Sequence, residues 1–168
     1  MNGPEKNIVE KAVAVGITHP RFEQLNVEQI DARPASSARY AYCSGIEAWS
    51  IDEFRKVLSA ISWTLEPGGI VRIAAEDLDA VVYGYLLEWT NGQSTHTTRA
   101  QRLNAWRRNE TAQFIYNEED LRAELEKAGF VDIWRLPAGA SSVKFFHDCE
   151  LHEPAGLVLE GRKPVSNQ

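Results

Sequence analysis

The sequence predicts an α/β fold in which helices cover both faces of a mostly parallel sheet that ends in an antiparallel pair of strands. Short apolar runs of strand length alternate along the chain with segments that carry apolar residues at helical spacing. The last two runs, 131–136 and 157–163, have no helical pattern between them, so we expect them to pair antiparallel. A chain of 168 residues suits one core, and we expect a single domain over 1–168.

The first quarter of the chain gives three candidate strands. Residues 12–15 form a short β-branched run that stops at Gly16, and a helix fragment fits this run as well. A second strand is expected at 25–28 and a third at 40–43. The stretch 31–39 lacks apolar periodicity and contains Pro34, so we interpret it as a loop.

The strongest helix signal begins at Ser50. Ser50 and Glu53 have the spacing of a capping box, in which each side chain satisfies a free backbone donor of the other. One apolar face follows, made of Phe54, Val57, Leu58, Ile61 and Leu65. Pro67-Gly68-Gly69 is expected to end this helix, and a strand at 70–75 to follow it.

Three further helices are expected. Apolar residues recur at helical spacing from Leu78 to Trp89, and Asn91-Gly92 is the expected stop. A short helix is expected around Leu103 and Trp106, and its arginines face either an anionic substrate or solvent. Asn117 caps the last helix, which Gly129 ends.

Charge and composition narrow the partners and the compartment. The net charge of −6 disfavours binding to nucleic acid or to an acidic membrane surface. The two cysteines, Cys43 and Cys149, cannot form a disulfide framework, which favours a reducing compartment. No run of about 18 apolar residues and no secretion signal is present, so we expect a soluble cytoplasmic protein.

Six ordered segments carry a family resemblance. Residues 63–74 are similar to the "L-K-P-G-G" segment before the fifth strand of class I S-adenosylmethionine-dependent methyltransferases, and Glu76-Asp77-Leu78 resembles the "P-D-L" of a subgroup associated with polysaccharide biosynthesis. That subgroup's "L-N", "F-x-Y-D-x-x-x-L", "L-x-x-A-G-F" and "V-E-A-x-K-P" patterns resemble residues 103–104, 114–121, 125–130 and 159–164. The resemblance implies a Rossmann-like three-layer sandwich, here with fewer strands.

The resemblance weakens toward the amino terminus, where the family binds its cofactor. Residues 13–16 align with the first strand and first glycine of the "G-x-G" motif, but Thr18 replaces the second glycine. In the family that second glycine lets the backbone approach the cofactor closely. Glu28 aligns with the acidic residue that accepts hydrogen bonds from the ribose hydroxyls. The connection from Glu28 to Tyr40 is too short for the family's intervening helix and strand.

In an open parallel sheet, ligands bind outside the carboxyl ends of the strands, where the candidate site residues are expected to gather. The resemblance implies cofactor-binding roles for Gly16, Glu28, Cys43 and Ser44, substrate-binding roles for Glu76 and Tyr116, and a catalytic role for Asp77. Structural alternatives stay open for four of them. Gly16 can simply end a strand, Glu28 can be a solvated carboxylate, Asp77 can cap the next helix, and Tyr116 can pack in the core.

A metal site is considered at His147, Cys149 and His152. Their spacing suits zinc, but a structural zinc site needs four ligands and no second ligand pair occurs elsewhere in the sequence, so we expect no metal.

Two functions remain open. The first is an S-adenosylmethionine-dependent methyltransferase for a small molecule, a sugar or polysaccharide intermediate if the subgroup's association holds. The second is a catalytically inactive relative that serves as a scaffold for itself or for a partner enzyme. Because a reduced sheet leaves apolar surface or an open edge to cover, we also expect a homodimer.

Overall fold

The structure is a computed structural model that describes residues 29, 33–91, 98, 100–101, 104, 112–147 and 156–165. The strands are β1 (Ala38–Ser44), β2 (Leu65–Ala75), β3 (Val131–Arg135) and β4 (Leu157–Arg162). The helices are α3 (Ile51–Thr64), α4 (Leu78–Asn91) and α6 (Glu118–Lys127), with short 3-10 turns η1 (Ile46–Ala48) and η2 (Lys144–Phe146). The strands expected at 12–15 and 25–28, the residues Gly16, Thr18 and Glu28, and Leu103, Trp106, Cys149 and His152 lie outside the described residues.

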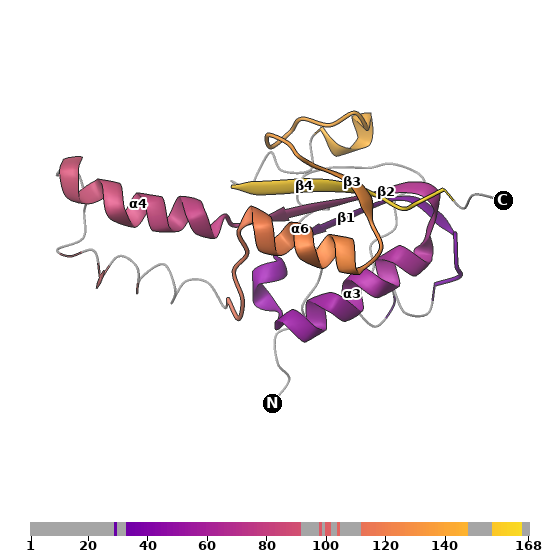
Figure 1. The fold of residues 1–168 in the computed structure, drawn as a ribbon, viewed down its shortest axis with the longest axis horizontal. Helices are drawn as coiled ribbons and strands as arrows, with labels where there is room; N and C mark the ends of the chain where they lie inside the picture. The colour runs from indigo at the N-terminus through magenta and orange to yellow at the C-terminus, as the bar shows by residue number, and fades with distance from the viewer. Residues whose placement is uncertain are drawn as a thin grey trace.

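The four strands form one sheet in the order β1-β2-β4-β3. β1 pairs parallel with β2, whereas β4 lies between β2 and β3 and runs antiparallel to both. Three strands therefore point one way and the last strand points the other way. This arrangement confirms the predicted α/β class, with its mostly parallel sheet and its antiparallel strand pair at the end of the chain (Figure 1).

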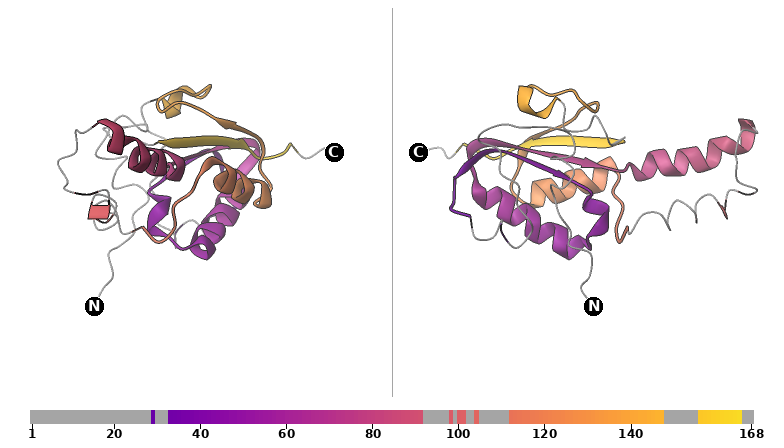
Figure 2. Two further views of the ribbon diagram at one scale, coloured as in Figure 1. Left: turned by 60° about the vertical axis from the view of Figure 1, so that its left-hand side comes forward. Right: turned by 180° about the vertical axis from the view of Figure 1, so that it is seen from behind.

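The two faces of the sheet are covered differently. Helices α3 and α6 lie side by side on one face (Figure 1), and the main core fills the space between them and the strands. Residues 136–147, which include η2, cover the opposite face (Figure 2), where Val143 and Phe146 pack with Tyr42 and Ile70. The sheet is thus the middle layer of three.

Strand β2 contributes side chains to both faces of the sheet, because successive side chains of a strand alternate between the faces. Val71, Ile73 and Ala75 belong to the core under α3 and α6. Arg72 points to the other side, is completely buried, and donates from Nη1 to Glu160 Oε1 over 2.6 Å and to the carbonyl of Ala140 over 2.9 Å. Its guanidinium carbon lies 5.9 Å from the centre of the Phe146 ring.

Helix α3 begins as predicted and ends earlier. Ser50 and Glu53 form the capping box. The expectation that Leu65 lies on the helix was wrong: the helix ends at Thr64, and Leu65 opens β2 opposite Ala38. The backbone amides of Ser36 and Ser37 bind the carbonyls of Trp63 and Thr64, so a long-range contact satisfies the end of the helix before the proline is reached.

Pro67-Gly68-Gly69 lies inside β2 rather than in front of it. Ala38 of β1 pairs with Leu65 of β2, whereas Tyr40, two residues later, pairs with Ile70. The β2 residues between Leu65 and Ile70 therefore form a bulge in the ladder. Gly68 has φ of 80°, a conformation that favours glycine, and its amide binds the carbonyl of Lys163. A Cβ on Gly69 would come within 2.8 Å of the Glu66 carbonyl oxygen, so this position also needs glycine.

Helix α4 forms at the predicted place but extends away from the sheet (Figures 1 and 2). Several of its large apolar side chains, including Val82, Tyr83 and Leu86, are exposed. The helical spacing predicted the helix correctly and gave no information on whether its apolar side meets the core of this chain.

Helix α6 carries a buried carboxylate, Glu124, that is held by cations. The Arg55 side chain donates from Nε and Nη2 to the two Glu124 oxygens over 2.7 and 2.9 Å, and Lys127 donates to Oε1 over 2.7 Å. Hydrogen bonding from Arg55 lowers the pKa of Glu124 from 4.5 to about 2 against the opposing effect of burial, and Lys127 adds to the lowering.

Acid is therefore expected to weaken the fold through Glu124. A carboxylate whose pKa is lower in the folded protein stabilises it fully above the unfolded pKa, and this contribution disappears as the pH falls from about 4.5 through about 2. Urea unfolding of the wild type and of Glu124→Gln at a series of pH values measures it. The stability difference between them is expected to shrink through this window, and a difference independent of pH would contradict the assignment.

Candidate functional site

The carboxyl ends of β1, β2 and β3 meet at one edge of the sheet because these strands point the same way. Ser44 is the last residue of β1, Glu76 and Asp77 follow β2, and Arg135 ends β3. Tyr116 comes to the same edge, since its carbonyl accepts the Leu78 amide over 3.0 Å. The structure therefore brings together Cys43, Ser44, Glu76, Asp77 and Tyr116.

The turn after β1 adds a residue that the sequence reasoning missed, Glu47. Gly45 has φ of 68° and starts the η1 turn, which carries Glu47. The Glu47 carboxylate accepts the backbone amide of Glu76, and its carbonyl accepts the amides of Gln113 and Phe114 over 2.7 and 3.3 Å. Glu47 thus ties β1, β2 and the segment before Tyr116 together, and an acid two residues after a strand-ending Ser-Gly was the only signal for it.

Both carboxylate oxygens of Asp77 have partners. Oδ1 accepts the amide of Asp79 over 3.0 Å, which caps the first turn of α4, and Oδ2 accepts from Arg135 Nη2 over 2.7 Å. Asp77 is buried, and a Cβ on Gly156 would come within 3.0 Å of it. These contacts give Asp77 the capping role, and its catalytic role stays a prediction.

Arg135 belongs to a chain of charges that the sequence reasoning also missed. Its Nη1 donates to Glu118 over 3.2 Å, and Glu118 accepts from Arg122 over 2.8 Å. Hydrogen bonding from Arg122, with a smaller contribution from Arg135, holds the pKa of Glu118 below its usual value. The hydrogen bond to Glu118, and to a lesser degree the one to Asp77, raises the pKa of Arg135. The Arg135 guanidinium therefore stays positively charged at the edge of the sheet.

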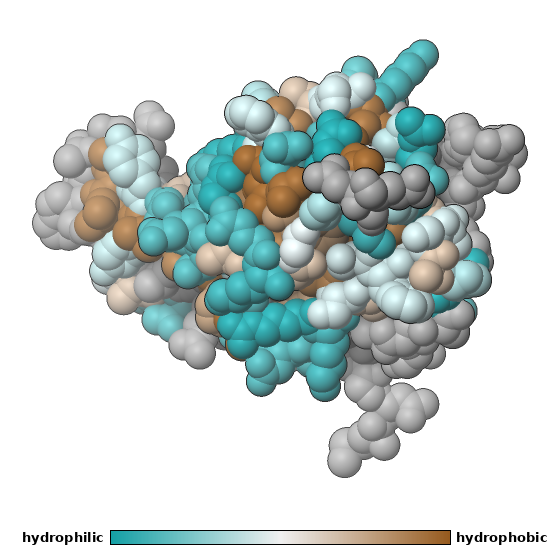
Figure 3. Space-filling view, turned by 45° about the vertical axis from the view of Figure 1, so that its right-hand side comes forward, coloured by the Kyte–Doolittle hydropathy of each residue, from teal (hydrophilic) through white to brown (hydrophobic). Residues whose placement is uncertain are grey.

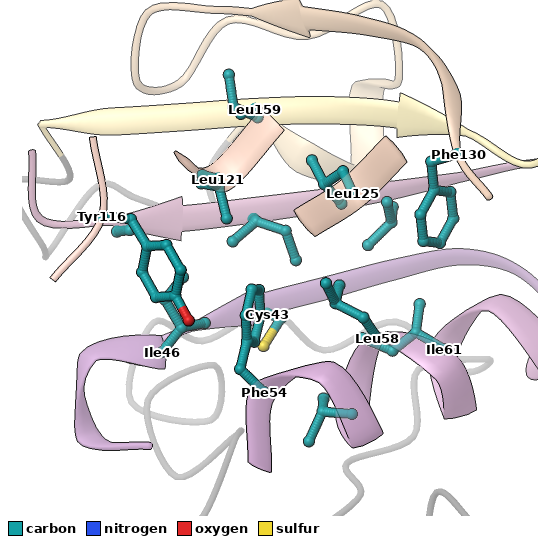
Figure 4. Close-up of a cluster of buried hydrophobic side chains, with 14 of the residues drawn as sticks. Cys43, Ile46, Phe54, Leu58, Ile61, Tyr116, Leu121, Leu125, Phe130 and Leu159 are labelled. Carbon is teal, nitrogen blue, oxygen red and sulfur yellow. The ribbon is translucent and has the colours of Figure 1, made fainter. Parts of the chain in front are cut away.

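Cys43 faces the core rather than solvent (Figure 4). Burial, and to a lesser degree the negative charge of Glu47, raises the pKa of its thiol to about 12, so the thiol stays neutral at physiological pH. Ser44 and Glu76 are half-buried. Cofactor-binding roles for Cys43 and Ser44 and a substrate-binding role for Glu76 stay predictions.

Tyr116 packs its ring between two other aromatic side chains. The ring centres of Phe54 and Phe114 lie 5.2 and 4.7 Å from that of Tyr116. The Tyr116 hydroxyl, labelled in Figure 4, is buried and has no hydrogen-bond partner among the described residues. Burial raises the pKa of this phenol. The substrate-binding role of Tyr116 stays a prediction, and in the structure the side chain packs in the core under α3 and α6.

Tyr116→Phe is expected to raise the free energy of unfolding of the ligand-free protein by about 1 kcal/mol, because a buried hydroxyl without a partner costs free energy. Urea denaturation measures the change. Phe114→Leu is the control, because it alters the ring next to Tyr116 and removes no hydroxyl. Its free energy of unfolding is expected to be lower than that of the wild type. A loss of stability in Tyr116→Phe would show that the hydroxyl has a partner in the folded protein.

Metal ligands and membrane-spanning helices were also considered. Within residues 33–91, 112–147 and the shorter described stretches, no three His, Cys, Asp or Glu side chains come together as a metal site. His147 Nε2 lies 2.8 Å from the carbonyl oxygen of Ser141. Because Cys149 and His152 are not described, the expectation of no metal stays a prediction. In the described part of the chain, no helix has the length and apolar character needed to cross a membrane.

Comparison with known proteins gives a likeness in fold only. No family model matches the sequence, and no curated protein matches it significantly. Among solved structures, an S-adenosylmethionine-dependent methyltransferase from Archaeoglobus fulgidus aligns with a TM-score of 0.50 and 10% identity over 89% of this chain and 71% of that chain. At this identity the alignment shows a shared Rossmann-like fold.

Two further structures align less closely. A possible exported protein from Bordetella parapertussis aligns over 81% of this chain with a TM-score of 0.47 and 16% identity. A Thermotoga maritima methyltransferase, described as a possible histamine N-methyltransferase, aligns over 78% with a TM-score of 0.46 and 17% identity. The chain spans 42% and 58% of the length of these two proteins.

Proposed function

We propose that this chain, which has the fold of S-adenosylmethionine-dependent methyltransferases, binds S-adenosylmethionine at the carboxyl edge of its sheet and methylates a small molecule. The observation that carries the proposal is the sheet itself, with β4 reversed between β2 and β3, in a chain that aligns with the Archaeoglobus fulgidus methyltransferase. The "L-K-P-G-G"-like segment forms the first residues of β2, whereas the resemblance placed it in front of the strand.

The residues at this edge suit the chemistry of the cofactor. S-adenosylmethionine carries a sulfonium and an ammonium group, and the carboxylates of Glu47 and Glu76 supply negative charge beside β1 and β2. The buried Tyr116 hydroxyl is a hydrogen-bonding group without a partner among the described residues. When bound, the cofactor supplies an activated methyl group, so the protein has mainly to align the acceptor and keep water away.

Each candidate residue then has one task. Gly16 lets the backbone approach the cofactor, and the Glu28 carboxylate accepts hydrogen bonds from its ribose hydroxyls. Ser44 offers the cofactor a hydroxyl at the end of β1, and Cys43 supports this edge from the core as a small neutral side chain. Glu76 and Tyr116 orient the acceptor. Asp77 accepts the acceptor's proton as general base, for which Arg135 must release one of its carboxylate oxygens.

The acceptor that we propose is a sugar or polysaccharide intermediate. Its support is the resemblance of residues 76–78 and 114–121 to the subgroup linked to polysaccharide biosynthesis. We also propose that the protein works in the cytoplasm, on the ground that it has only two cysteines.

A non-catalytic scaffold is the second candidate function. The observation that favours it is Asp77, whose two carboxylate oxygens are both engaged by Asp79 and Arg135. A side chain held in this way stabilises the start of α4, and each of its oxygens already accepts a hydrogen bond. A scaffold of this kind would associate with itself or support a partner enzyme.

Calorimetric titration with S-adenosylmethionine and with S-adenosylhomocysteine separates the two candidates. The methyltransferase proposal predicts micromolar binding that Glu28→Ala weakens by about 10-fold or more, because two hydrogen bonds to a charged group are lost. Glu126→Ala, which removes an exposed carboxylate of α6, is the matched control and should bind like the wild type. Absence of heat at millimolar ligand would contradict cofactor binding and favour the scaffold.

A further inference from the structure

Glu47 lies at the carboxyl edge of the sheet but has no task of its own in the proposed methyl transfer. It belongs to η1, three residues after the end of β1, and it is half-buried. The edge lies at the base of α4, which projects from the body of the molecule (Figure 2) and forms the projecting lobe with apolar surface in Figure 3. A carboxylate in this place acts on a bound ligand through its charge as well as through hydrogen bonds.

Several hydrogen bonds fix Glu47 at this edge. Its carboxylate accepts the backbone amide of Glu76, directly after β2. Its carbonyl accepts the amides of Gln113 and Phe114 over 2.7 and 3.3 Å, and the Gln113 side chain donates to the neighbouring carbonyl of Ala48 over 2.9 Å. Because main chain and side chain are both held, the Glu47 carboxylate has a defined place beside the ends of β1 and β2.

The charge of Glu47 already affects a neighbouring group. Burial is the main cause that raises the pKa of the Cys43 thiol, and the negative charge of Glu47 raises it further. Cys43 is the last residue but one of β1. A carboxylate that disfavours a second anion at the end of β1 favours a cation there, because the Coulomb interaction changes sign with the charge.

The sulfonium of S-adenosylmethionine is such a cation, and the product of methyl transfer lacks it. When the methyl group moves to the acceptor, the electron pair of the broken bond stays on sulfur, so S-adenosylhomocysteine has a neutral thioether. Two unit charges about 10 Å apart, at an effective dielectric constant of about 20, attract strongly enough to change an affinity roughly 10-fold, and salt reduces this effect to a few-fold. Glu47 can therefore act on the sulfonium without touching it.

We propose that Glu47 distinguishes the cofactor from its product: its carboxylate strengthens the binding of S-adenosylmethionine relative to that of S-adenosylhomocysteine. This role rests on the proposed function, because it needs the cofactor to bind outside the ends of β1 and β2. After methyl transfer the sulfonium charge is gone, so the product is held less tightly and leaves the site more readily.

Calorimetric titration of the full chain with both ligands tests this role in two variants. Glu47→Gln keeps an oxygen that can accept the Glu76 amide and removes the charge. We expect its affinity for S-adenosylhomocysteine to stay within about 2-fold of that of the wild type, and its affinity for S-adenosylmethionine to fall about 3- to 10-fold. Glu47→Ala also removes the acceptor, so both ligands bind more weakly, but the ratio of their dissociation constants changes by the same factor as in Glu47→Gln.

Glu126→Gln, which removes an exposed carboxylate near the C-terminal end of α6, is the control and should keep the wild-type ratio of the two dissociation constants. Raising the salt concentration from roughly 0.05 M to roughly 0.5 M should shrink the difference between Glu47→Gln and the wild type. Circular dichroism spectra establish that the variants fold. A ratio in both Glu47 variants equal to that of Glu126→Gln would overturn this role alone, whereas a wild type that binds neither ligand would contradict the proposed function itself.

Discussion

Replacing Glu160 with alanine is expected to lower the free energy of unfolding by about 3–5 kcal/mol, because it removes the buried carboxylate that pairs with the buried Arg72 guanidinium. Arg72 is completely buried beneath η2, and Glu160 is buried opposite it on β4. Their 2.6 Å contact joins the two central strands of the sheet. Arg72 also donates to the carbonyl of Ala140 and lies against the face of Phe146, and neither group carries a full negative charge.

Urea denaturation of Glu160→Ala measures this loss, and a double variant separates charge from packing. In Arg72→Met with Glu160→Leu both charges are removed and the volume is kept, so stability is expected to stay within about 1.5 kcal/mol of the wild type. A single variant that loses less than about 1 kcal/mol would mean that water reaches Arg72 and that η2 does not seal this face.

Phe54→Ala is expected to cost about 3–5 kcal/mol, the usual range for removing a large buried aromatic side chain. Phe54 lies on the inner side of α3, where its ring centre is 6.4 Å from that of Trp49 and 5.2 Å from that of Tyr116. It thereby connects α3 to η1 and to the segment that carries Tyr116. Removing it creates a cavity directly below the candidate site.

Thermal or urea unfolding measures the loss in Phe54→Ala, and Lys56→Ala on the exposed side of the same helix is the matched control, with a change within about 0.5 kcal/mol. We further expect Phe54→Ala to weaken binding of S-adenosylhomocysteine, since Tyr116 loses the ring against which it packs. A stable Phe54→Ala variant would contradict the core packing described above.

The elements that the sequence predicted well are those whose boundaries depend on neighbouring residues. The capping box of Ser50 with Glu53 involves residues three apart, and the Asn117 side chain likewise accepts the amide of Asp120 over 2.9 Å. Strands β3 and β4 were found from short apolar runs, and the absence of a helix between them indicated their antiparallel pairing. Such local chemistry is visible without knowledge of the fold.

The features that the sequence did not predict depend on residues far apart in the chain. Leu65 leaves the helix because Ala38 pairs with it, and Arg72 is buried because Glu160 stands opposite it 88 residues later. The partner of Asp77 is Arg135, 58 residues away. A pattern of apolar residues also predicts that α4 is a helix without determining what its apolar side contacts.

Some residues of the candidate site were likewise predicted from the sequence, and others were not. Asp77 was expected at the carboxyl edge from the rule for open parallel sheets, and Tyr116 was expected either on the substrate side or in the core. The structure pairs the two at this edge. Glu47 and Arg135 were missed because a single charged residue carries no periodic signal, and its importance comes from the backbone amide or carboxylate that it meets. Roles for Gly16 and Glu28 stay predictions, as they lie outside the described residues.

A crystal structure of the protein grown with S-adenosylhomocysteine is the most direct test of cofactor binding at the carboxyl edge of the sheet. The account predicts an adenosyl group outside the ends of β1 and β2, with its ribose hydroxyls on the Glu28 carboxylate and its amino-acid end beside Ser44. An edge filled by side chains of this chain, with the ligand absent at millimolar concentration, would contradict the account and leave only the shared fold.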